Sequence, residues 1–256
     1  MRIPRIHVSS LPDRGEVAIP LPAAHHLRSV LRLAPGAPVV LFDGHGRAYQ
    51  AVLTSLARQK ATAALQTPLE AESGEPSLRL VLGIAPLKGD GLSWVVEKAT
   101  ELGVSEIWLI EAQRADQSAR TALSPHRLER LQRIAVSAAE QCERSRVPEI
   151  KSPATLATAL ERTLQGPRLI CAERSSQPWP SPPTAVDQTL LLVGPHGGWT
   201  SEEVDLAVAS GCQPISLGPR ILRAETAALA ALAVAQATWG DGPGRTGANP
   251  APATPC

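Results

Sequence analysis

Two short segments near the C-terminus decide the fold. The first is Gly194-Pro195-His196-Gly197-Gly198-Trp199-Thr200, which directly follows the apolar run at residues 190–193. The second is Leu217-Gly218-Pro219-Arg220-Ile221-Leu222-Arg223-Ala224-Glu225-Thr226-Ala227, which directly follows Pro214-Ile215-Ser216. Each pattern predicts a strand, a tight glycine loop and a helix, because glycine lets the main chain turn sharply and lie against a ligand. Two such loops at neighbouring strand ends of an α/β sheet would form a crevice for a small molecule.

The rest of the chain divides into two patterns. Residues 1–72 predict closely spaced short strands and one helix, which indicates a small β-barrel domain. Residues 73–240 predict apolar strands that alternate with helices, which indicates a mostly parallel sheet covered on both faces. Residues 241–256 are rich in Gly, Pro, Ala and Thr, and we expect this tail to be disordered.

Individual elements follow from periodicity and from helix start and stop signals. The expected strands lie at 3–8, 16–19, 39–42, 48–53, 61–65, 78–84, 106–110, 168–172 and 189–193, and the expected helices at 23–31, 90–102, from Pro125, 154–164, from Thr200 and 225–239. The polar, Pro- and Gly-broken segment 67–77 is the expected linker between the two domains.

The composition limits the classes of function. The 256 residues carry a formal net charge of +1, so any contact with nucleic acid must come from local patches. Residues 1–72 and residues 114–151 each carry eight Arg or Lys against five Asp or Glu. The four cysteines form no Cys-x-x-Cys pair and the six histidines are scattered, so we expect no metal site and reduced thiols. A secretory signal and an apolar run of about 18 residues are both missing from the pattern, so we expect a cytoplasmic protein.

The common phosphate motifs do not match. The first glycine loop is not followed by Gly-Lys-Ser/Thr, so it is not a Walker loop, and it is not Gly-x-Gly-x-x-Gly. These mismatches argue against a nicotinamide dehydrogenase and against a methyltransferase of the ordinary dinucleotide-like fold.

Charged residues beside the second loop indicate a site. The negative charge of Glu225 near the first turn of a helix is stabilised by the helix dipole, whereas the positive charges of Arg220 and Arg223 at that end are destabilised by it. Arginines held in that place indicate work on an anion or a polar ring.

Further basic residues are candidate RNA contacts or ordinary solvated surface. Arg144 and Arg146 cluster with Gln141 where a helix runs out, and Lys88 follows a strand end. His25, His26, Arg28 and Arg32 form a basic face on the helix of the small domain, where contact with RNA is plausible.

Taken in order, these motifs resemble those of the bacterial 16S ribosomal RNA uridine-N3 methyltransferases of the SPOUT superfamily. The match starts in the helix of the small domain and covers nearly all of residues 20–240. It is carried by residues 25–32, Lys88, residues 97–104, Glu140-Gln141 with Arg144 and Pro148, the Gly-Pro-x-Gly-Gly loop, and the Leu-Gly-x-Arg-Ile-Leu-Arg-x-Glu-Thr-Ala motif.

The resemblance implies a fold and an activity. The fold would be a trefoil-knotted, mostly parallel sheet with helices on both faces, preceded by a small PUA-like β-barrel that binds RNA. A homodimer would methylate N3 of one decoding-region uridine in 16S rRNA of the assembled small subunit, with S-adenosylmethionine as the methyl donor and no metal or membrane involved.

The resemblance also assigns residues. Arg223 would stabilise the imide anion that develops at N3, and Glu225 would either accept the proton or brace Arg223. The RNA contacts would be His25, His26, Arg28, Arg32, Lys88, Arg144 and Arg146, together with the polar Gln141. The cofactor would lie against Cys171, Val193, Gly194, Pro195, His196, Gly197, Gly198, Ser216, Leu217, Gly218, Ile221, Leu222, Arg223 and Thr226.

One residue departs from the family pattern. The loop usually has Glu at its third position, and His196 stands there in this chain. A neutral imidazole keeps a hydrogen bond but not the negative charge. Two alternatives therefore stay beside the main hypothesis: a non-catalytic RNA- or ribosome-binding protein that retains the fold, and a SPOUT methyltransferase that acts on another RNA.

Overall fold

The computed structural model describes residues 2–69, 74–118, 124–162, 164–173, 175, 177–180 and 186–242. Its contacts divide the chain into two compact units. The first runs to Glu75 and includes Val136–Val147, and the second consists of Pro76–Ala135 and the chain from Pro148 onward. The expected domain boundaries at 72 and 240 stay a prediction, and residues 243–256 of the expected disordered tail lie outside the described residues.

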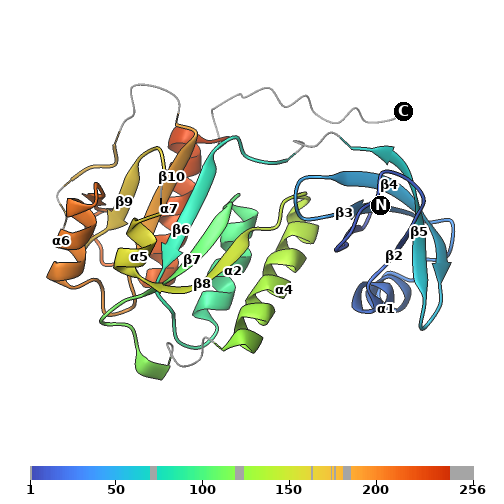
Figure 1. The fold of residues 1–256 in the computed structure, drawn as a ribbon, viewed down its shortest axis with the longest axis horizontal. Helices are drawn as coiled ribbons and strands as arrows, with labels where there is room; N and C mark the ends of the chain where they lie inside the picture. The colour runs from blue at the N-terminus through green and yellow to red at the C-terminus, as the bar shows by residue number, and fades with distance from the viewer. Residues whose placement is uncertain are drawn as a thin grey trace. The chain divides into compact units, whose positions relative to one another are not determined.

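The described part of the first unit contains a curled sheet of five strands in the order β1-β3-β4-β5-β2 (Figure 1). These are β1 (Arg5–His7), β2 (Glu16–Ala18), β3 (Pro38–Phe42), β4 (Ala48–Leu56) and β5 (Ala61–Pro68), and the helix α1 (Leu21–Ser29) follows β2. β1 pairs with β3 in parallel, and the other pairs are antiparallel. The predicted small, strand-rich N-terminal domain is confirmed.

Local sequence explains this unit. The Asp43 carboxylate accepts the backbone N–H groups of His45 and Arg47, at 2.8 and 3.1 Å, which closes the turn between β3 and β4. Inward-facing aliphatic side chains of the strands, among them Leu41 and Leu53, form the core, and Leu27 of α1 packs into it. The helix is therefore held by its apolar stripe.

In the second unit the described strands form one parallel sheet in the order β11-β9-β10-β6-β7-β8. Their bounds are β6 (Arg79–Ile84), β7 (Glu106–Glu111), β8 (Glu149–Thr155), β9 (Arg168–Cys171), β10 (Gln188–Val193) and β11 (Gln213–Ile215). The helices of this unit are α2 (Gly91–Glu101), α5 (Leu156–Leu160), α6 (Ser201–Ala209) and α7 (Ala224–Trp239). The helix α4 (Pro125–Cys142) starts in this unit, and its residues from Val136 onward are assigned to the first unit.

Helices cover both faces of this sheet. The step from β6 through α2 to β7 and the step from β10 through α6 to β11 run in opposite directions along the sheet. Right-handed crossovers therefore place α2 and α6 on opposite faces. α7 packs beside α2 and over β6 and β10, and α5 packs beside α6. The predicted α/β architecture is confirmed, while the threading of the C-terminal segment through a knot stays a prediction.

The structure corrects one stretch of the expected elements. A helix was expected over 154–164, but residues 149–155 form the edge strand β8 and only Leu156–Leu160 are helical. Thr155 both ends the strand and caps the helix, because its hydroxyl accepts the N–H of Thr158 at 3.2 Å. β8 is half-exposed and contains a proline, so it lacks the apolar run that marked the inner strands.

Candidate functional site

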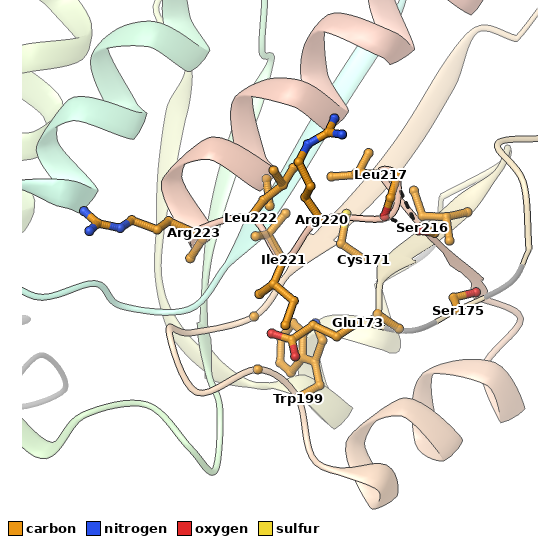
Figure 2. Close-up of a pocket in the computed structure, with 18 of the residues that line it drawn as sticks. Cys171, Glu173, Ser175, Trp199, Ser216, Leu217, Arg220, Ile221, Leu222 and Arg223 are labelled. Carbon is orange, nitrogen blue, oxygen red and sulfur yellow. Dashed lines mark hydrogen bonds between the residues drawn. The ribbon is translucent and has the colours of Figure 1, made fainter.

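Three loops meet at one edge of the parallel sheet. β11, β9 and β10 are neighbouring parallel strands, so their C-terminal ends lie side by side at the same end of the sheet. The segments that follow them line a cavity of about 610 Å³ (Figure 2). A cavity of this size at the carboxyl ends of parallel strands has the place and the volume of a small-molecule site.

Hydrogen bonds to main-chain carbonyls hold two of these loops together. The N–H of Ala172 donates to the carbonyl of Ile215 at 3.1 Å, and the hydroxyl of Ser175 donates to the carbonyl of Pro214 at 3.1 Å. The N–H of Ser216 donates to the carbonyl of Gln177 at 3.3 Å. The wall of the cavity is therefore built from backbone as much as from side chains.

The glycine loop after β10 is a tight turn. The N–H of Gly198 donates to the carbonyl of Pro195 at 2.9 Å, and Gly198 has a φ of 68°, which favours glycine. A Cβ on Gly194 would lie 3.2 Å from the Trp199 ring, so the indole packs directly on the main chain. The guanidinium of Arg114 donates to the carbonyls of Gly197 and Trp199, at 3.4 and 3.3 Å.

The end of this loop is fixed by a capping box at the start of α6. The Thr200 hydroxyl accepts the N–H of Glu203 at 3.2 Å, and the Glu203 carboxylate accepts the N–H of Thr200 at 2.8 Å. Glu203 is buried and also accepts the N–H of Gln113 at 2.7 Å. One carboxylate therefore ties the glycine loop to the segment after β7.

The loop after β11 presents apolar and charged groups. Gly218 has a φ of 113°, and its N–H donates to the Ser216 hydroxyl at 3.2 Å. Ile221 is 73% exposed although it lines the cavity, so its side chain offers free apolar surface to a ligand. Figure 2 shows Arg223 pointing away from Cys171 and Ser216, on the side opposite to the loop after β9.

The two glycine-loop motifs are joined by a side-chain pair. The His196 Nε2 atom lies 3.1 Å from one carboxylate oxygen of Glu225 and 3.2 Å from the other. The side chains are 41% and 20% exposed. Partial burial acts to raise the pKa of Glu225, but the carboxylate's own backbone N–H and His196 outweigh it, so the pKa lies below its ordinary value. The motifs alone gave no sign of this pair.

Most of the predicted cofactor residues gather at the cavity. All of them line it except Gly197, which faces Arg114, and Thr226, which is exposed on α7. Sequence reasoning singled out Arg220 for its charge beside the second loop but did not assign Trp199. At the end of β9 and in the loop after it, which carries no motif, only Cys171 was assigned to the cofactor. The additional lining residues are Ala172, Glu173, Ser175, Gln177, Pro178, Trp199, Ile215, Pro219, Arg220, Ala224 and Ala227.

The predicted RNA contacts fall in both units. His25 and His26 on α1 are exposed, Arg28 is partly exposed, and Arg32 after the helix is exposed with a φ of 54°. Gln141 and Arg146 are exposed in the same unit.

Lys88 belongs to the second unit. Its ammonium lies 2.7 Å from the Asp116 carboxylate, and this bond, with help from Ser118, lowers the pKa of Asp116 to about 2. Lys88 itself is exposed.

Arg144 requires a correction. Its side chain is 5% exposed and its guanidinium lies 3.0 Å from the Glu75 carboxylate, which is 6% exposed. Glu75 also accepts the N–H groups of Ser145 and Arg146, at 2.7 and 2.8 Å. Arg144 therefore holds the turn after α4. Its guanidinium is paired with Glu75 inside the protein and is not presented to RNA.

Among the described residues, no group of three or more His, Cys, Asp or Glu could hold a metal ion. Burial raises the pKa of the Cys171 thiol to about 12, so this cavity-lining cysteine stays protonated. In the part of the chain that the structure describes, no helix has the length and hydropathy needed to cross a membrane.

Two family models match the chain. The RNA methyltransferase domain matches residues 74–236, and the RNA methyltransferase PUA domain matches residues 22–66. The first match covers more than half of the chain, so the protein is an RNA methyltransferase, and its first unit contains a PUA domain.

Individual relatives narrow the family. The ribosomal RNA small subunit methyltransferase E of Synechocystis is 38% identical over 218 residues, which cover 82% of this chain and 69% of the relative. A crystal structure of the protein of that name from Neisseria gonorrhoeae, bound to S-adenosyl methionine, has a TM-score of 0.85 at 33% identity and covers 94% of this chain and 99% of its own. A Legionella pneumophila protein solved with the cofactor SAM has a TM-score of 0.83 at 30% identity, covering 94% and 100%. The chain belongs to the family of ribosomal RNA small subunit methyltransferase E, as its motifs indicated.

Proposed function

We propose that this protein transfers a methyl group from S-adenosylmethionine to N3 of a decoding-region uridine in 16S rRNA of the assembled small ribosomal subunit. The observation that carries the proposal is the cavity formed by the loops after β9, β10 and β11. It is supported by two relatives of the same fold whose structures hold this cofactor.

The cavity residues fit the cofactor by shape and by charge. Backbone lies bare at Gly218, where an added Cβ would meet nothing within 4 Å, and Ile221 offers exposed apolar surface, which suits a flat adenine ring. Glu173 places a carboxylate in the cavity, near Gly198, where it would complement a cation. When bound, S-adenosylmethionine supplies an electrophilic methyl group on a positively charged sulfur.

The protein's own groups then act on the uridine. N3 of uridine is an imide nitrogen that carries a proton at neutral pH, so this proton must leave before or during the transfer. The exposed guanidinium of Arg223 would stabilise the negative charge that develops on the imide. The loops would hold N3 in line with the methyl carbon. This alignment lowers the entropic cost of bringing the two reactants together.

RNA binding is assigned to the exposed basic residues. His25, His26, Arg28 and Arg32 on and after α1 would contact the rRNA backbone, together with Arg146 and Lys88. Gln141 would add a polar contact beside Arg146. We further propose that the protein acts as a homodimer in the cytoplasm, where assembled small subunits are found.

Replacement of Arg223 tests the proposed reaction. Arg223→Ala should lower the rate of methyl transfer by about 10²–10³-fold and leave the melting temperature unchanged, because Arg223 is exposed and acts on charge in the transition state. The measurement is label transfer from S-adenosylmethionine to assembled small subunits and, in parallel, to naked rRNA. Unchanged turnover would remove Arg223 from the mechanism.

Primer extension identifies the target base. N3 methylation blocks base pairing, so rRNA from cells that lack the protein should lose a stop in the decoding region. A stop lost from another RNA would instead favour a methyltransferase with a different substrate. Calorimetry that detects no cofactor binding would favour a non-catalytic ribosome-binding protein.

A further inference from the structure

The pair formed by His196 and Glu225 carries an inference that rests on the proposed function and deepens it. We propose that His196 is the catalytic residue that accepts the N3 proton of the target uridine, and that Glu225 is a positioning residue that holds the imidazole. The departure of His196 from the family pattern then marks a specific acid–base arrangement in this chain.

The geometry fixes which nitrogen of the imidazole can act. Nε2 lies 3.1 and 3.2 Å from the two oxygens of the Glu225 carboxylate. An ionised carboxylate only accepts hydrogen bonds, so the proton of a neutral imidazole sits on Nε2. The lone pair is then on Nδ1, which is the nitrogen that remains to accept a proton.

The two residues stand at different depths. His196 lines the cavity and its side chain is 41% exposed, whereas the Glu225 side chain is 20% exposed and is not among the residues that line the cavity. The imidazole is therefore the member of the pair that the uracil ring of a bound uridine would contact. A Cβ on Gly91 would lie 2.7 Å from Oε1 of Glu225, so the carboxylate is packed closely against the start of α2.

Glu225 is poorly suited to accept the proton itself. Its oxygens already accept from His196 and from its own backbone N–H, and these bonds keep its pKa below the ordinary value although burial acts to raise it. Imidazole is the side chain that changes charge in the physiological range, which suits a general base at neutral pH.

The charged groups around the pair come from several elements. Arg223 interacts electrostatically with Glu225 from the loop that leads into α7, and Arg220 lines the cavity from the same loop. Glu173 lies near Gly198 from the loop after β9, and Arg114 holds the carbonyls of the glycine loop from the segment after β7. The imidazole thus sits on an anchored loop among groups of both signs.

The step balances in protons and electrons. The N3–H bond breaks and its proton moves to Nδ1 of His196, while the N3 electron pair forms the new bond to the methyl carbon. The electron pair of the broken carbon–sulfur bond stays on sulfur, which becomes a neutral thioether. The imidazolium is stabilised by the Glu225 carboxylate until it releases the proton from Nδ1 to water.

The test compares His196→Gln, Glu225→Gln and His126→Gln in the full-length protein. His126 is an exposed histidine on α4 outside the cavity, so it is the matched control. Single-turnover transfer of label from S-adenosylmethionine to unmodified small subunits is measured over about pH 5–9, a range that spans imidazole ionisation. Calorimetry of cofactor binding and thermal unfolding accompany each variant.

The proposal predicts a specific pattern. The wild-type rate and the His126→Gln rate should rise with pH through one ionisation and then level off. His196→Gln should be slower by about 10²–10³-fold, with an unchanged cofactor Kd and no levelling off, because hydroxide must now remove the proton. Glu225→Gln should be about tenfold slower and keep an ionisation, shifted to lower pH because the imidazolium loses its counter-charge.

A more acidic substrate separates proton removal from packing. Small subunits that contain 5-fluorouridine carry an N3 proton that leaves more easily, so they should restore most of the lost rate to His196→Gln. A His196→Gln variant with wild-type rate and pH profile, or with a loss that follows only from weaker cofactor binding, would overturn the inference and leave the proposed function standing. Absence of any transfer by the wild-type protein would overturn both.

Discussion

Two acidic side chains of this protein are paired with a basic partner in contrasting surroundings. Glu75 in the first unit is 6% exposed and lies 3.0 Å from the guanidinium of Arg144, which is 5% exposed. Glu225 in the second unit is 20% exposed and lies 3.1 Å from His196, which is 41% exposed and lines a cavity. The first pair can only hold the chain, whereas the second can also exchange protons with a ligand and with water.

This difference shows how burial separates structural pairs from chemical ones. A sealed pair has no route for a proton or a substrate, and removing one partner leaves an uncompensated charge. A half-exposed pair at a cavity contributes little to stability, because solvent screens it, but it stays available for reaction. The sequence made Arg144 a candidate RNA contact and Glu225 a candidate for the reaction, and motif spacing did not show that the first is sealed inside the protein while the second is partly exposed.

The largest effect is expected for the sealed pair. Glu75→Ala should destabilise the first unit by roughly 3–5 kcal/mol, because it removes the buried carboxylate that pairs with Arg144 and accepts two backbone N–H groups. Hydrogen exchange of β3 and β4 measures this locally, with Glu129→Ala on the exposed side of α4 as the control. A loss below about 1 kcal/mol, the range of exposed pairs, would erase the contrast between the two sites.

An intermediate effect is expected for Glu203, which is buried and accepts backbone N–H groups. Glu203→Ala removes acceptors from the N–H groups of Thr200 and Gln113 and should cost about 1–3 kcal/mol. The glycine loop should loosen with it, so cofactor affinity should fall together with stability, as measured by calorimetry and urea unfolding. A stability loss with unchanged affinity would show that the loop keeps its shape without the capping box.

The smallest effect on stability is expected for His196→Gln. At neutral pH the free energy of unfolding should change by less than about 1 kcal/mol, since the pair is partly exposed. The pKa of Glu225 is depressed in the folded protein, so its contribution is present above the ordinary glutamate pKa and is lost as the pH falls through the lower folded value. The variant should therefore lose less stability on acidification, as urea midpoints over about pH 3–7 measure. Equal acid sensitivity would mean that His196 does not stabilise the ionised carboxylate.

Much of the fold followed from sequence because its signals are local. The apolar runs of β6 and β10, the turn at Asp43 and the capping box of Thr200 each lie within a few residues. The edge strand β8 was missed, since a half-exposed strand with a proline lacks an apolar run. Periodicity also could not show that Val136–Val147, which comprises the end of α4 and the turn after it, belongs to the first unit, because an apolar stripe does not reveal what it packs against.

The parts of the candidate site that lie within a sequence motif could be predicted, whereas the parts formed by residues distant in sequence could not. The glycine loops place Gly194 and Gly218 at the cavity as expected. The loop after β9 carries no motif, and its place depends on the strand order β11-β9-β10. The contact of His196 with Glu225 joins residues 29 positions apart, which only the fold brings together.

The central claim is that the loops after β9, β10 and β11 hold S-adenosylmethionine with its methyl group turned toward Arg223 and His196. A crystal structure of the protein with this cofactor and a uridine-containing oligonucleotide tests it most directly. The account predicts cofactor density in the cavity between Glu173, Trp199 and Leu217, with the methyl carbon facing the imide nitrogen. Cofactor bound elsewhere, or a cavity closed by Ile221 and Trp199 in the crystal, would contradict it.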